Sequence, residues 1–157
     1  PLAARERKWN TRTGKANFIV PTQMFAGDVD SFGKADVLQL MTLRSNDQFN
    51  TTIYGYDDRL RGVHGSRMVV LMNKDDMKRL GFKDQDFVDL ETNADDGVER
   101  RATAFRVHSY PLPKGNVGGY YPELNKLVPL WHHAKESECP AAKSVPVRIT
   151  RSTGPVA

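Results

Sequence analysis

The sequence predicts a mainly β domain, folded as a small closed barrel with one or two short helices. Three observations favour this fold class. Apolar runs of strand length recur along the chain, and Gly, Pro, Asn and Asp residues that form turns separate them. Only one segment carries helix-capping signals at both ends. The length of 157 residues suits one such domain with a flanking arm.

The expected strands follow one another along most of the chain. Residues 36–43 are apolar with little alternation, which predicts burial on both faces of this strand. The other expected strands lie at 16–20, 67–72, 87–90, 98–107, 117–121 and 145–149. Pro146 lacks a backbone donor, so it indicates an edge or end position in the last strand.

One helix is expected at Lys74–Leu80. Asn73 precedes it as the expected N-cap residue, and Asp75 and Asp76 add negative charge to its first turn, where the helix dipole favours it. Gly81 follows at the position where a left-handed residue ends many helices. Farther along, residues 93–97 have the composition of a hairpin turn.

The net charge of +4 comes from the first 20 residues, which hold five basic residues and one acidic residue. The remaining 18 basic and 18 acidic residues cancel. We therefore expect a basic arm over residues 1–15, a neutral barrel domain over 16–150 and a tail over 151–157. A neutral body does not favour the steering of a polyanion. A nucleic-acid-binding module that grips phosphates with its arm stays an alternative, although no specific nucleic-acid partner is expected.

Composition excludes several classes of protein. The single cysteine, Cys139, rules out an internal disulfide and a metal or iron–sulfur site built from cysteines alone, and it favours the cytoplasm. No apolar run approaches the roughly 20 residues that span a membrane. Residues 1–15 lack the apolar core of a secretory signal, and the missing initiator Met indicates an excised fragment. The four histidines lack metal-ligand spacing, so surface or hydrogen-bonding roles are expected.

A long polar stretch follows the first confident strand, over residues 44–65, and long loops of this kind are usually functional. Its first part offers a guanidinium, hydroxyls, amides and an aromatic ring, which together suit a polar heterocycle and its phosphates. The alternative is an ordinary polar loop in which Arg44 pairs with Asp47. Asp57 and Asp58 are adjacent and diverge, so a solvated position is expected for both.

Six segments, in the same order, resemble the C-terminal domain of the molybdopterin oxidoreductases, the dimethyl sulfoxide reductase superfamily. The resemblance is strongest to formate dehydrogenase-like alpha subunits. It covers roughly residues 13–150 and rests on the segments 13–18, 42–51, 70–81, 86–90, 125–128 and 142–149. The sequence departs from the family pattern at two turns, where Gln85 replaces a glycine and Lys74 replaces a proline.

The resemblance implies a six-stranded double-psi β-barrel that binds molybdopterin guanine dinucleotide. The cofactor-binding residues that it implies are Thr42, Arg44, Ser45, Gln48, Phe49, Asn50, Thr51, Asn125 and Lys143. It also implies that molybdenum or tungsten is ligated outside these 157 residues and that an iron–sulfur cluster belongs to the parent protein only. No catalytic or metal-ligating residue is therefore expected here, and the isolated fragment should be inactive. The expected partners are the N-terminal domains of the same subunit, and the Trp131 region is a candidate docking patch.

Overall fold

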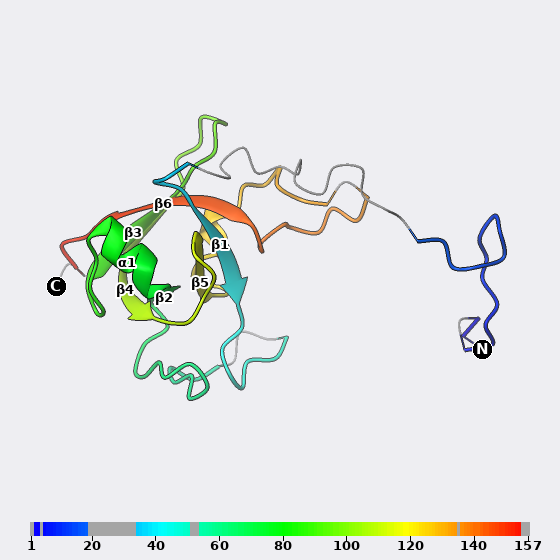
Figure 1. Cartoon of the computed structure of the whole chain (residues 1–157), viewed down its shortest axis with the longest axis horizontal. Coiled ribbons are helices and arrows are strands. Elements are labelled where there is room, and N and C mark those ends of the chain that lie inside the picture. Colours follow the sequence, from blue (N-terminus) through cyan, green and yellow to red (C-terminus); the bar gives the residue numbers. More distant parts are fainter. Residues whose placement is uncertain (1, 4, 19–33, 51–53, 135, 155–157) are drawn as a thin grey trace. The chain divides into compact units, whose positions relative to one another are not determined.

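The computed structural model of the chain describes residues 2–3, 5–18, 34–50, 54–134 and 136–154 (Figure 1). The chain divides into two compact units, Pro1–Asp30 and Ser31–Ala157. The described residues of the first unit form turns, with no helix or strand among them. The short strand expected at 16–20 is therefore not formed at residues 16–18, and residues 19 and 20 lie outside the described residues.

The second unit is a closed barrel of six strands. Around the barrel they follow the order β1-β5-β2-β4-β3-β6. Their bounds are β1 Leu38–Leu43, β2 Val69–Met72, β3 Phe87–Thr92, β4 Arg101–Ser109, β5 Asn116–Tyr120 and β6 Val145–Arg151. The predicted mainly β fold with a six-stranded barrel is confirmed. Closure leaves the barrel without an edge strand, so Pro146 occupies the other position expected for it, the start of a strand.

The pairing of the strands decides which connections meet at each end of the barrel. β1 runs parallel to β5, and β2 runs parallel to β4, while the other four pairs are antiparallel. Leu43, the last residue of β1, lies opposite Tyr120, the last residue of β5. β6 is antiparallel to β1, so its first residue, Val145, lies near the end of β1, opposite Leu40. The chain leaving β1, the chain leaving β5 and the chain entering β6 therefore meet at one end.

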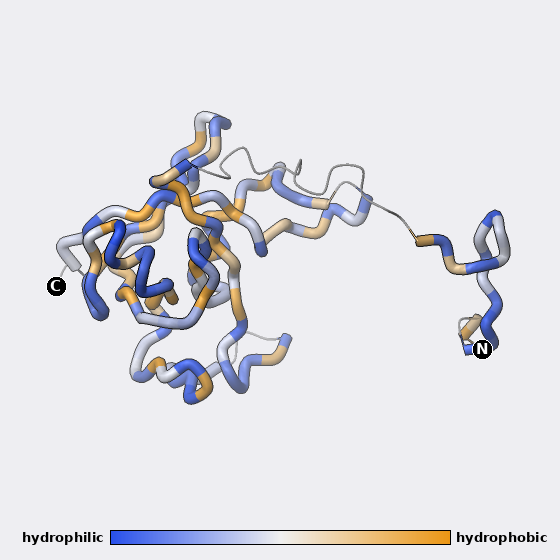
Figure 2. The backbone as a smooth tube through the Cα atoms, viewed as in Figure 1, coloured by the Kyte–Doolittle hydropathy of each residue, from blue (hydrophilic) through white to orange (hydrophobic). Residues whose placement is uncertain are grey.

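An apolar cluster fills the barrel, and Figure 2 shows the hydrophobic stretches following the strands. A second, smaller cluster joins Val63 of the long loop to Val69, Leu71 and Tyr120. As a result, all four residues of β2 are buried. The burial on both faces predicted for β1 holds only in part, because Met41 is 37% exposed.

The helix α1, Lys74–Leu80, begins and ends where its capping residues predict. The Asn73 side chain accepts a hydrogen bond from the Asp75 backbone N–H at 2.7 Å. Gly81 takes the left-handed conformation with φ of 76°, which glycine adopts at little cost. A 3-10 helix, η1, at Asn125–Leu127 is the other short helix among the described residues of the second unit.

Two turns need comment, one because it is longer than the sequence predicts and one because its backbone is left-handed at Gln85. β4 begins at Arg101 and not at residue 98, because residues 93–100 form the connection from β3. There the Asp96 carboxylate accepts hydrogen bonds from Arg100 and from the Trp131 indole, and these bonds lower the pKa of Asp96. In the other turn, Gln85 has φ of 70°, a left-handed conformation that accounts for the glycine in the family pattern.

Candidate cofactor-binding cleft

The end of the barrel at which the three chain segments meet carries a cleft of about 330 Å³. The first segment is the end of β1 with Arg44, the second is the stretch that leaves β5, and the third is the stretch that enters β6. The residues that line the cleft are Thr42, Leu43, Arg44, Tyr121, Asn125, Pro140, Ala142 and Lys143. The strand order creates this cleft, because the first segment lies about 80 to 100 residues before the other two in the sequence.

Four of the nine predicted site residues line this cleft. They are Thr42, Arg44, Asn125 and Lys143. Thr42 is buried, whereas the other three side chains are exposed. Backbone and side-chain bonds hold the walls together: the Thr42 N–H donates to the Ala142 carbonyl at 2.9 Å, and the Lys143 ammonium donates to the Thr42 carbonyl.

Arg44 offers a free positive charge to the cleft. Its guanidinium has no hydrogen-bond or ion-pair partner among the residues that the structure describes. The pairing with Asp47 that would make this an ordinary polar loop is not formed, because Asp47 instead accepts a hydrogen bond from the Asn46 amide at 2.6 Å. An exposed guanidinium at the end of a strand can bind a planar, bidentate anion such as a phosphate.

Ser45 and Gln48 are buried and face away from solvent, toward Arg67. Arg67 donates to the Ser45 hydroxyl at 2.5 Å and to the Gln48 side-chain oxygen at 3.0 Å. Gln48 in turn donates to the Tyr121 carbonyl at 2.9 Å. Both side chains therefore already have protein partners, and their hydrogen bonds stabilise the buried side of the loop.

Of the three remaining predicted site residues, the two that the structure describes lie on the outer part of the loop. Phe49 is 78% exposed, and Asn50 is also exposed. Thr51 lies outside the described residues. Neither Phe49 nor Asn50 lines the cleft, and the contact of all three residues with the cofactor stays a prediction.

Arg67 is the residue that sequence reasoning missed. The sequence predicts it only as the first residue of a strand, yet its side chain is 2% exposed and belongs to an ion pair with Glu123. Its guanidinium lies 3.7 Å from the centre of the Tyr54 ring and 4.8 Å from that of Tyr120. The one available signal was an arginine directly beside an apolar run, which is too common to identify a buried cation.

Asp58 corrects another expectation, since it is buried and not solvated. Its carboxylate accepts hydrogen bonds from the Arg61 guanidinium at 2.5 Å and from the Tyr120 hydroxyl at 2.9 Å. Burial opposes ionisation, but these bonds outweigh it and lower the pKa of Asp58. Burial, together with the hydrogen bond to Asp58, raises the pKa of Tyr120. Asp58 thus fastens the long loop to β5.

This pair predicts an acid-sensitive anchor. Because the folded-state pKa of Asp58 is lowered, its contribution to stability is full above about pH 4 and is lost as the pH falls through the folded value. We expect Asp58→Asn to lower the free energy of unfolding at pH 7 by about 1–3 kcal/mol. The difference from the unchanged chain should shrink below pH 4. Denaturant unfolding of both proteins from pH 3 to 7 measures this, and a difference independent of pH would contradict it.

The histidines take hydrogen-bonding and surface positions, as expected. His108 contacts the Arg61 carbonyl at 2.9 Å, and His132 contacts the Ser144 carbonyl at 3.0 Å. Within the described ranges, no group of three or more His, Cys, Asp or Glu residues is arranged to hold a metal ion. No helix in the described part of the chain is long and apolar enough to cross a membrane.

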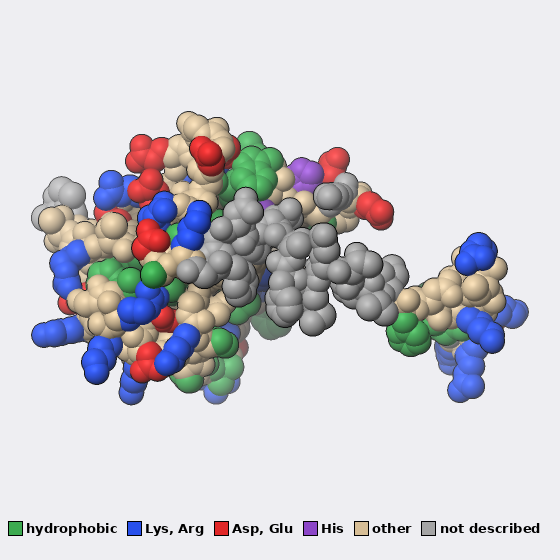
Figure 3. All heavy atoms as spheres, turned by 45° about the horizontal axis from the view of Figure 1, so that its top comes forward, with side chains coloured by type: hydrophobic (Ala, Val, Ile, Leu, Met, Phe, Trp, Pro, Cys, Tyr) green, Lys and Arg blue, Asp and Glu red, His purple; other side chains and the backbone are tan. Residues whose placement is uncertain are grey.

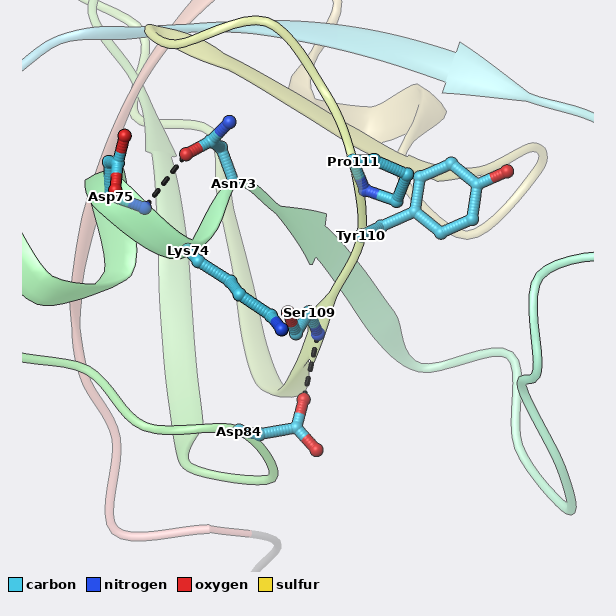
Figure 4. Close-up of a pocket in the computed structure, with 7 residues that line it drawn as sticks. All are labelled: Asn73, Lys74, Asp75, Asp84, Ser109, Tyr110 and Pro111. Atoms are coloured by element: carbon cyan, nitrogen blue, oxygen red, sulfur yellow. Dashed lines mark hydrogen bonds between the residues drawn. The ribbon is translucent and has the colours of Figure 1, made fainter.

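A larger cavity of about 830 Å³ lies beside the start of α1, at the opposite end of the barrel (Figure 4). None of the predicted site residues lines it. Its carboxylates serve local structure: Asp84 accepts from the Ser109 backbone N–H at 2.7 Å, and Asp75 pairs with Lys114 at 2.8 Å. Both of these carboxylates therefore already have partners, whereas the Arg44 guanidinium in the smaller cleft has none among the described residues.

Comparison with known families assigns the barrel unit to a family. A family model described as "Molydopterin dinucleotide binding domain" matches residues 38–146, which is more than half of the chain. The match runs from the first residue of β1 into β6 and includes all three segments of the cleft. The chain therefore belongs to the molybdopterin dinucleotide-binding domain family.

Similar proteins occur in distant bacteria. The chain is 47% identical over 148 residues to an uncharacterized oxidoreductase of Mycobacterium tuberculosis, with 91% of this chain and 18% of the relative covered. It is 40% identical over 152 residues to the protein YdeP of Escherichia coli, with 96% of this chain and 20% of the relative covered. The chain thus spans about a fifth of the length of these relatives.

The comparisons do not favour the nucleic-acid alternative. Figure 3 shows acidic and basic side chains interspersed over one face of the barrel unit, without a continuous basic patch on that face. A nucleic-acid footprint would instead gather cations along one face or groove.

Proposed function

We propose that this domain binds molybdopterin guanine dinucleotide through the cleft at the end of β1, with Arg44, Asn125 and Lys143 as its polar contacts. The observation that carries the proposal is their convergence. A strand end, a 3-10 turn and the lead into β6 bring a free guanidinium, an amide and an ammonium to one cleft. The family to which the chain belongs binds a cofactor with phosphates and a polar ring system.

The chemistry of the donors fits such a group. Arg44 and Lys143 supply positive charge for phosphate oxygens, and the Asn125 amide can both donate to and accept from a heterocycle edge. A cleft of about 330 Å³ is at the lower end of the size of ligand pockets, so it accommodates one portion of a dinucleotide. When bound, the cofactor supplies the redox chemistry, and this domain binds and orients it.

We further propose that the parent protein is a molybdenum or tungsten oxidoreductase of the formate dehydrogenase type, which oxidises formate to carbon dioxide. The naming of the Mycobacterium relative as an oxidoreductase supports the general class. The sequence resemblance supports the formate dehydrogenase type. In this proposal the N-terminal domains of the same subunit ligate the metal, hold an iron–sulfur cluster and cover the cleft. In the same proposal the isolated domain is inactive and the parent is cytoplasmic.

Arg44→Ala in the full-length protein tests the cofactor site. Loss of one charge-assisted contact should weaken cofactor binding by about 10-fold or more. Lys143→Ala should act in the same direction with a smaller effect, because an ammonium is a point charge and not a planar fork. The measurement is molybdenum or tungsten and guanine nucleotide retained per subunit after dialysis.

Arg151→Ala is the matched control. Arg151 is also an exposed guanidinium, but it ends β6 and so lies at the opposite end of the barrel, where it pairs with Asp86. It should leave cofactor content unchanged. Full retention of metal and nucleotide in Arg44→Ala and Lys143→Ala would show that this cleft is not the cofactor site.

A further inference from the structure

The buried Arg67 contacts both walls of the cleft without lining it. On one side it donates to the Ser45 hydroxyl and the Gln48 side-chain oxygen. On the other side it donates to the Tyr121 carbonyl at 2.7 Å and to Glu123, at 2.6 Å from its Nε and 3.1 Å from its NH2 group. One side chain thus joins the loop that follows β1 to the turn that follows β5.

We propose that Arg67, held by Glu123, is a positioning residue that sets the spacing of the two cleft walls and thereby the affinity for the cofactor. This inference rests on the proposed function of the cleft. Arg44 directly precedes Ser45, and Asn125 follows Glu123 by two residues. A change in the link between the walls would therefore move two of the proposed cofactor contacts relative to each other.

The geometry requires arginine at this position. A planar guanidinium has five donors in a fixed fork, and here they reach four different residues. Its flat faces also contact aromatic rings, those of Tyr54 and Tyr120. A lysine ammonium has three donors and no flat face, so it cannot join the same set of acceptors.

Other side chains near Arg67 also link the long loop to the end of β5. Gln48 makes a second link of the same kind, from the first wall to the Tyr121 carbonyl. Tyr120, whose ring lies over Arg67, also donates its hydroxyl to Asp58 of the long loop. The loop is therefore fixed to the end of β5 and to the residue after it through three side chains, Arg67, Gln48 and Asp58.

The test is a double-mutant cycle in the full-length protein with Arg67→Met and Arg44→Ala. The quantity measured is the affinity for the cofactor, taken from metal and guanine nucleotide retained at graded dilution. Groups that orient a ligand's direct contacts typically contribute about 10- to 100-fold, so Arg67→Met should weaken binding by that factor. Arg67→Lys should weaken it less. In the Arg44→Ala background, Arg67→Met should cost much less, because the contact that it positions is already gone.

A matched control separates positioning from general instability. Asp76→Asn removes a buried charge on α1, at the far end of the barrel, where Asp76 binds Arg79 and the Gly115 backbone N–H. It should lower the unfolding midpoint and leave cofactor retention unchanged. If Asp76→Asn loses as much cofactor as Arg67→Met, or if the Arg67 and Arg44 effects are additive, the positioning role is overturned.

The two proposals fail in different ways. If Arg44→Ala lowers affinity while Arg67→Met and Arg67→Lys do not, the cleft stands and the positioning role falls. If Arg44→Ala and Lys143→Ala have no effect, the cofactor site itself is wrong. If Arg67→Met fails to fold, Arg67→Lys and Ser45→Ala replace it, each in its own double-mutant cycle with Arg44→Ala. If the effects on cofactor affinity are additive in both cycles, the proposal is again overturned.

Discussion

Replacing Glu123 with alanine is expected to lower the free energy of unfolding by about 3–5 kcal/mol, the usual cost of removing one partner from a buried ion pair. The Arg67 side chain is 2% exposed, and that of Glu123 is 15% exposed. Without Glu123 the guanidinium keeps its neutral acceptors, Ser45, Gln48 and the Tyr121 carbonyl, but loses its compensating charge.

Two further variants decide whether the buried charge is the cause. Arg67→Met/Glu123→Leu removes both charges together and should recover part of the lost stability, since apolar replacements of buried pairs are often neutral. Asp36→Ala breaks the exposed Asp36–Arg148 pair and should leave the unfolding midpoint unchanged. Denaturant unfolding followed by circular dichroism measures all three. A Glu123→Ala midpoint equal to that of Asp36→Ala would refute the buried-pair account.

Gly119→Ala is the second large effect that we expect, a loss of about 3 kcal/mol at the upper end of the overpacking range. A β-carbon on Gly119 would lie 2.1 Å from the Leu124 Cδ1 and 3.3 Å from the Val69 carbonyl oxygen. Leu124 is fully buried, so its side chain cannot swing into solvent to make room. Relief would require the turn that carries Leu124 and Asn125 to move outward.

The neighbouring glycine and the clashing leucine supply the controls. Gly118→Ala meets Leu43 at 2.9 Å, and Leu43 is only partly buried, so the destabilisation should be smaller. In a Leu124→Ala background, Gly119→Ala should cost less than in the unchanged chain, because the clashing methyl group is absent. Equal costs in the two backgrounds would show that Leu124 is not the reason for glycine at this position.

Both predictions concern the turn after β5, which carries Glu123, Leu124 and Asn125. Arg67 and Glu123 hold it on one side, and the close contact of Leu124 with Gly119 holds it on the other. Asn125, at the start of η1, is therefore presented to the cleft from a rigid base. A binding residue on such a base loses little conformational entropy when a ligand arrives, which favours tight binding.

Local signals were sufficient to predict the helix and most strand positions. Asn73 and Gly81 set the ends of α1 because capping depends on hydrogen bonds within a few residues of the helix terminus. The start of β4 was placed three residues too early, since residue 98 continues the apolar pattern although the turn, fastened by Asp96 and Arg100, extends to residue 100. Strand boundaries depend on pairing partners, which a local pattern does not contain.

The sequence was less informative about individual polar residues. Arg44, Asn125 and Lys143 were expected at a common site from the family resemblance, and the structure places them around one cleft. Ser45 and Gln48 stood in the same segment, but their side chains point to a buried guanidinium. Residues adjacent in a loop can face opposite ways, so a polar run alone cannot separate ligand contacts from internal supports.

The sequence by itself determined the class of fold, the position of α1 and which residues make up the long polar loop. These features depend on propensity, capping and apolar periodicity, which act over short distances. Only the tertiary structure decided which groups meet. The parallel pairing of β1 with β5 puts Arg44 beside the turn at Asn125, and closure by β6 adds Lys143. The burial of Asp58 and Arg67 likewise depends on partners from distant segments, Tyr120 and Glu123 among them. A charge can be buried only where such partners compensate the loss of water, and that compensation exists only in the closed barrel.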